Sequence, residues 1–112
     1  MGKKRSGMKQ MARLLLIPAA VILAAAPALA HTPLCSCYDN GDGTATCEGG
    51  FSDGSSASGV KIRVESGGKV LIKGKMDADS EFSFDKPTGA YKVVFDAGEG
   101  HAVEIDGKEI VE

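Results

Sequence analysis

The chain has 112 residues, a formal net charge of −2, no tryptophan and only 5% aromatic residues. The charge is unevenly distributed, because residues 1–13 hold five basic residues and no acidic one. A domain that begins at residue 31 carries 8 basic against 15 acidic residues, a formal net charge of −7. A surface this acidic argues against binding to nucleic acid or anionic lipid, and it suits a protein that interacts with cations.

Residues 1–30 have the three parts of a secretory signal peptide, which we expect to form an N-terminal signal helix. A basic stretch, 1–13, precedes an apolar run, 14–30, that ends in Ala28-Leu29-Ala30. The apolar run is shorter than the roughly 20 residues of a membrane-spanning helix. We expect cleavage after Ala30, with an uncleaved anchor as the alternative. The product, 31–112, is then a single periplasmic or secreted domain that is not inserted into the membrane.

From residue 31 onward, short alternating segments are separated by turn residues, and none of them has helical periodicity. The predicted strands are 34–38, 44–48, 60–65, 69–76, 81–85, 91–96, 101–105 and 109–111. The last two are expected to form a hairpin that turns at Asp106-Gly107. The pattern predicts an all-β domain, a small antiparallel β-sandwich of about seven strands.

Residues 58–96 resemble the carboxypeptidase regulatory-like, prealbumin-like sandwich. That pattern contains a strand, then G-x-V/L, T-D-x-x-G-x-F and G-x-Y-x-V. The matching segments are Val60-x-Ile62-x-Val64, Gly68-Lys69-Val70-Leu71, Asp77-Ala78-Asp79-Ser80-Glu81-Phe82 and Gly89-Ala90-Tyr91-x-Val93. Ser80 stands where the pattern usually has glycine. The resemblance implies the same two-sheet fold.

The segment Ala97-Gly98-Glu99-Gly100-His101 is similar to the A-G-x-G-H signature of a small periplasmic domain in nickel and cobalt uptake systems. Those domains begin at or next to a histidine and contain a Gly- and Ser-rich loop, like 49–54. This chain lacks the arginine and the acidic-aromatic pair that follow the signature, and its cysteines are not part of the pattern. The resemblance implies a periplasmic accessory protein that binds or delivers nickel or cobalt, with a membrane metal permease as its partner.

The chain has two histidines, His31 and His101. Cleavage after Ala30 leaves His31 with a free α-amine, so the two residues together offer three nitrogen donors. The amine has an ordinary pKa of about 7.7–8.0 and is easily deprotonated by a metal. Such donors suit Cu(II) or Ni(II). The alternative is that His31 is a frayed terminal residue and that His101 is a polar residue at the start of a strand.

The three cysteines, Cys35, Cys37 and Cys47, lie on either side of a turn signal at 39–43. Cys35 and Cys37 are two residues apart and therefore project from the same face of a strand. A connection of three or five residues places Cys37 opposite Cys47, which predicts a Cys37–Cys47 disulfide and a free Cys35. The alternative is that the thiols provide soft ligands for Cu(I) or Zn(II) beside His31.

No arrangement of a nucleophile and a base appears in the sequence, and we do not expect an enzyme. Residues 77–81 resemble the start of a calcium loop but lack its glycine, so we interpret them as a turn between strands. Two further functions stay open. One is a non-catalytic structural or interaction module stabilised by a disulfide, and the other is copper redox chemistry at His31 and His101.

Overall fold

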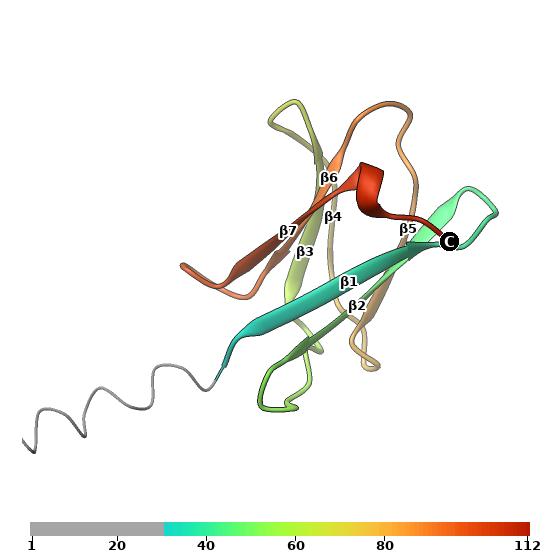
Figure 1. The fold of residues 1–112 in the computed structure, drawn as a ribbon. Helices are drawn as coiled ribbons and strands as arrows, with labels where there is room; N and C mark the ends of the chain where they lie inside the picture. The colour runs from blue at the N-terminus through green and yellow to red at the C-terminus, as the bar shows by residue number, and fades with distance from the viewer. Residues whose placement is uncertain (1–30) are drawn as a thin grey trace, which may run out of the picture. The chain divides into compact units, whose positions relative to one another are not determined.

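The computed structural model describes residues 31–112, which form one unit, and the predicted signal peptide lies outside the described residues. Seven antiparallel strands make two sheets, and the all-β prediction is confirmed (Figure 1). The strands are β1 (Pro33–Asp39), β2 (Thr44–Phe51), β3 (Lys61–Ser66), β4 (Lys69–Lys75), β5 (Glu81–Asp85), β6 (Lys92–Asp96) and β7 (Ala102–Asp106). Within residues 31–112, no helix is long and apolar enough to cross a membrane.

The two sheets have three and four strands. Their strand orders are β1-β2-β5 and β4-β3-β6-β7. β1 and β2 form a hairpin, as do β3 and β4, whereas β5 pairs with β2 and β6 pairs with β3. Consecutive strands therefore change sheets after β2, β4 and β5, and this connectivity brings distant parts of the sequence into one core.

The core lies between the sheets, because alternate residues of each strand point inward. Val64 and Val93 face each other across β3 and β6, and the fully buried Phe95 packs against Phe51 of the other sheet with ring centroids 6.4 Å apart. Burial of one phenylalanine side chain contributes about 1.5–3 kcal/mol. The buried hydrophobic cluster comprises Ala45, Cys47, Ala57, Ile62, Val64, Met76, Phe84, Val93, Phe95 and Ile110.

The turn between β4 and β5 contains Ser80 at the position where the prealbumin-like pattern has glycine. Ser80 has a φ of 62° and is the one non-glycine residue with positive φ in the described chain. This conformation favours glycine. The Ser80 hydroxyl compensates by accepting a hydrogen bond from Ala57 N at 2.9 Å. Asp77 Oδ1 accepts bonds from Asp79 N and Glu81 N, so the segment is a turn closed by its own carboxylate.

The predicted hairpin between 101–105 and 109–111 is wrong in its second half. After β7 the chain enters a short 3₁₀ helix, η2 (Gly107–Glu109), which the Asp106 side chain caps by accepting from Lys108 N. Gly107 packs beneath the Tyr91 ring, where a Cβ atom would lie 2.6 Å from a ring carbon. The end of the chain then reaches β1, and Asp39 N donates to Val111 O at 3.0 Å. The alternation at 109–111 therefore reflects burial of Ile110 rather than strand pairing.

Gly74 in β4 provides a stringent test of the packing between the sheets. A Cβ atom at Gly74 would lie 2.2 Å from Cε1 of Phe82, which belongs to the other sheet. We expect Gly74→Ala to lower the free energy of unfolding by about 1–3 kcal/mol, because the ring must move. The matched control is Gly50→Ala in β2, where the nearest atom lies 4.0 Å from the added methyl. Equal urea midpoints for the two variants would contradict this packing.

Candidate metal site

The first residues of the domain are held against the turn that follows β2. Thr32 N donates to Ser52 Oγ at 3.0 Å, and Ser52 N donates to Thr32 O at 2.9 Å. These two bonds continue the β1–β2 pairing by one step beyond Pro33 and Phe51. The backbone next to His31 is therefore fixed at the edge of the sheet.

Asp53 in this turn is the polar partner of His31. Asp53 Oδ2 lies 2.8 Å from His31 Nδ1, and Asp53 Oδ1 accepts from Ser55 N at 3.0 Å and from Ser55 Oγ at 2.6 Å. The hydrogen bonds from Ser55 lower the pKa of Asp53, and the nearby His31 adds to this effect. The carboxylate is thus ionised at neutral pH, with one oxygen held by the turn and the other beside the imidazole.

Asp53 was not among the residues singled out from the sequence. The sequence predicts only a Gly- and Ser-rich loop around it. The sequence does contain an aspartate two residues before a serine. This spacing allows the aspartate carboxylate to accept a hydrogen bond from the serine N–H. That spacing predicts a turn, but it gives no indication that the turn lies beside His31.

His101 lies in a different environment. Its Nδ1 lies 3.0 Å from Glu99 O, and the turn before it contains Gly98 and Gly100 with φ angles of 120° and 75°. These glycines form a tight turn, in which His101 N donates to Gly98 O at 2.9 Å. Each histidine has its own local partner, Asp53 for His31 and the Glu99 carbonyl for His101. Within residues 31–112, the group of three metal-ligating side chains that the fold brings together consists of cysteines alone.

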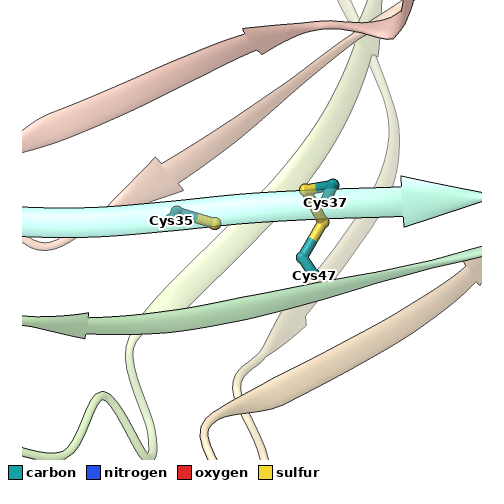
Figure 2. A group of neighbouring side chains, drawn as sticks. All are labelled: Cys35, Cys37 and Cys47. Atoms are coloured by element: carbon teal, nitrogen blue, oxygen red, sulfur yellow. A yellow bond between two sulfur atoms is a disulfide. The ribbon is translucent and has the colours of Figure 1, made fainter. Parts of the chain in front are cut away.

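The three cysteines converge on the inner side of the β1–β2 hairpin (Figure 2). Cys37 and Cys47 lie opposite each other in the register and form a disulfide. Cys35 is the free cysteine, and the three sulfur atoms all lie within 4.8 Å of one another. Burial raises the pKa of the Cys35 thiol to about 11. At neutral pH the Cys35 thiol is therefore protonated.

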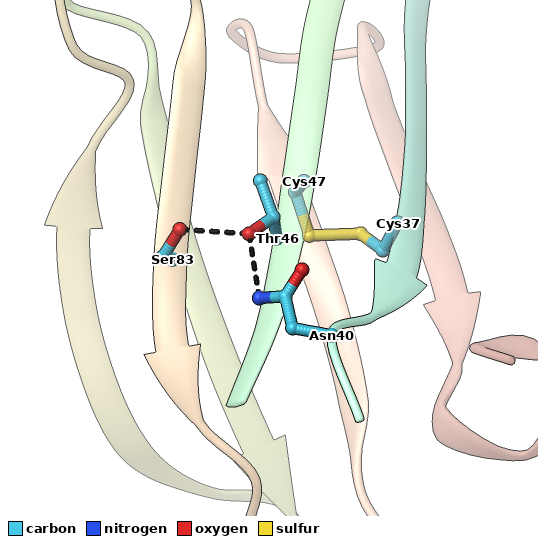
Figure 3. Close-up of a disulfide and its surroundings, with 5 residues drawn as sticks. All are labelled: Cys37, Asn40, Thr46, Cys47 and Ser83. Atoms are coloured by element: carbon cyan, nitrogen blue, oxygen red, sulfur yellow. Dashed lines mark hydrogen bonds between the residues drawn. A yellow bond between two sulfur atoms is a disulfide. The ribbon is translucent and has the colours of Figure 1, made fainter. Parts of the chain in front are cut away.

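Hydrogen bonds on the opposite face of β2 support the same register (Figure 3). Thr46 is 7% exposed, and its hydroxyl accepts from Asn40 Nδ2 at 2.9 Å and pairs with Ser83 Oγ at 2.8 Å. Asn40 Nδ2 also donates to Thr44 Oγ1 at 2.9 Å. The disulfide on one face and these side chains on the other therefore fix how β1, β2 and β5 align.

Comparisons with protein-family models, curated proteins and solved structures find no match to this chain. The chemistry open to this chain is therefore set by the donor atoms that the fold brings together. The imidazole and carboxylate at the edge of the sheet suit divalent transition metals such as Ni(II) and Cu(II). Of the three sulfur atoms between the sheets, two form the disulfide, and Cys35 alone has a free thiol.

The disulfide predicts how the thiols react. In oxidised native protein, iodoacetamide at pH 7 should label Cys35 slowly and the other two cysteines not at all, because Cys35 is half-buried and protonated. After unfolding without reductant, peptide mapping should show a single labelled cysteine. Replacing Cys37 and Cys47 with serine should remove roughly 2.5–3 kcal/mol of stability for a loop this short. Three labelled thiols in the oxidised protein would refute the pairing.

The lowered pKa of Asp53 predicts a dependence of stability on pH. Because folding lowers this pKa below 3.8, the resulting stability is present above pH 4 and is lost as the pH falls through the folded value. Asp53→Asn should therefore be less stable than the wild type at pH 7, and the difference should shrink by pH 2. Ser55→Ala should shift the Asp53 titration, followed by NMR, upward. An unchanged titration in Ser55→Ala would show that the Ser55 hydroxyl does not hold the carboxylate.

Proposed function

We propose that residues 31–112 form an exported periplasmic accessory protein that binds a divalent transition metal and delivers it to a membrane permease, in nickel or cobalt uptake. The protein acts as a carrier and not as an enzyme. The observation that carries the proposal is the 2.8 Å distance between His31 Nδ1 and Asp53 Oδ2. The similarity of 97–101 to the signature of nickel and cobalt uptake domains supports the same conclusion.

The distance between these two atoms suits neighbouring ligands of one metal ion. Nitrogen and oxygen ligands bind such ions at about 2.0–2.2 Å, so two ligands at a right angle lie roughly 3 Å apart. In a chain that begins at His31, the α-amine and Nδ1 of that residue close a chelate ring. Asp53 then adds an ionised oxygen, which Ser55 holds in place.

The exposure of the site suits a carrier that exchanges its metal with another protein. The side chain of His31 is 67% exposed and that of Asp53 is 31% exposed. A partner protein therefore has access to the metal without unfolding the sandwich. The net charge of −7 for residues 31–112 also raises the local concentration of cations around the domain.

A structural or interaction module is the second candidate function. The Cys37–Cys47 disulfide favours it, because the disulfide and the shared core stabilise the sandwich without any metal. In that case the His31–Asp53 contact is a surface hydrogen bond and metal affinity is weak. The two functions therefore predict different metal affinities, which can be measured directly.

Calorimetry on protein that begins at His31 tests the proposal. We expect one Ni(II) or Cu(II) ion per chain. One extra residue before His31, or Asp53→Asn, should each weaken binding at least tenfold, about 1.4 kcal/mol, because each removes or displaces a ligand. N-terminal sequencing of the exported protein should likewise begin at His31.

Asp42→Asn is the matched control, because Asp42 Oδ1 accepts from Thr44 N and Oγ1 in a turn of the same kind. This variant should bind as the wild type does. His101→Ala separately tests the third nitrogen expected from the sequence: a tenfold loss identifies His101 as a ligand, and an unchanged affinity removes it. Full affinity in both the extended chain and Asp53→Asn would contradict the proposal and favour the structural module.

A further inference from the structure

We propose that Cys35, Cys37 and Cys47, once the disulfide is reduced, form a three-thiolate site for one soft monovalent metal ion, Cu(I). This site is separate from the one formed by His31 and Asp53, and it does not depend on the proposed function. It arises because three sulfur atoms from two adjacent strands lie within 4.8 Å of one another.

The positions of the sulfur atoms suit trigonal coordination. Metal–thiolate bonds of about 2.3 Å place three sulfurs around one ion roughly 4 Å apart. Cys35 and Cys37 project from the same face of β1, and Cys47 lies opposite Cys37 on β2 (Figure 2). Opening the disulfide therefore requires only that the Cys37 and Cys47 sulfurs separate by side-chain rotation, while the backbone ladder stays in place.

The set of donors favours Cu(I) over Zn(II). A structural zinc site takes four ligands, whereas the group in residues 31–112 has three sulfurs and includes no histidine, aspartate or glutamate. Soft thiolate ligands select Cu(I) among the first-row ions. A three-sulfur site without a nitrogen or oxygen donor is therefore matched to a monovalent copper ion.

The surroundings of the sulfurs are apolar. Cys47 is fully buried, and Cys35 lies opposite Gly49, which has no side chain to fill the space. The Phe95 ring and the Met76 methyl group cover Gly49, because a Cβ atom there would lie 2.7 Å and 3.1 Å from them. An apolar shell of this kind limits access of water and protects Cu(I) from oxidation.

A dithiol reductant opens the site by reducing the disulfide. Its two thiols reduce the Cys37–Cys47 bond by thiol–disulfide exchange, so two protein thiols form and the reductant becomes a disulfide. Binding of Cu(I) to the three thiols then releases their three protons.

The experiment compares oxidised and dithiol-reduced protein under anaerobic conditions, with the reductant removed by gel filtration. Cu(I) affinity is measured by competition with bicinchoninate, and stoichiometry by native mass spectrometry. We expect one Cu(I) per reduced chain and at least 100-fold weaker binding to the oxidised form. Reduced Cys35→Ser, which keeps the other two thiols, should bind at least tenfold more weakly than reduced wild type. Ser36→Ala, an exposed position on the same strand, is the matched control.

Asp53→Asn and the extension before His31 should leave Cu(I) affinity unchanged, which separates this site from the divalent-metal site. The proposal is overturned if Cys35→Ser binds Cu(I) as tightly as reduced wild type, or if the oxidised form does. It is also overturned if the Asp53 variant loses Cu(I) affinity. Circular dichroism is recorded alongside, and a reduced chain that stays unfolded with Cu(I) present would equally overturn it.

Discussion

The alignment of β1 with β2 is the constraint on which the rest of this domain depends. Cys37 and Cys47 are bonded at directly opposite positions, and Thr46 is hydrogen-bonded on the other face of the same strand. A shift of one residue would turn every β1 side chain to the opposite face. The Cys35 side chain would then point away from the core. The same pairing, continued through Thr32 and Ser52, places His31 beside the turn after β2.

The size of the domain explains why this covalent bond matters. A chain of 82 residues buries only about 60–65% of its unfolded surface, so the hydrophobic contribution to stability is modest. A disulfide within a short loop lowers the entropy of the unfolded chain by an amount that is large relative to the net stability of such a domain. Chemistry at the disulfide is therefore coupled to the stability of the fold.

The fold separates two kinds of donor atoms in a small volume. His31 and Asp53 lie at the exposed edge of the β1–β2 hairpin. The sulfurs lie on the inner side of the same hairpin, against the buried cluster. The two metal sites that we propose therefore lie in different environments, and the sulfur site requires reduction of the Cys37–Cys47 disulfide.

The sequence by itself determined the all-β class, most of the strands and the pairing of Cys37 with Cys47, because alternation and hairpin spacing are local properties of a strand. Only the tertiary structure decided which residues from separate loops meet. Asp53 gained its place beside His31 through the β1–β2 register, and the segment around Ile110 became a buried tail rather than a strand. These contacts depend on how sheets and loops pack, and no periodicity in the sequence encodes them.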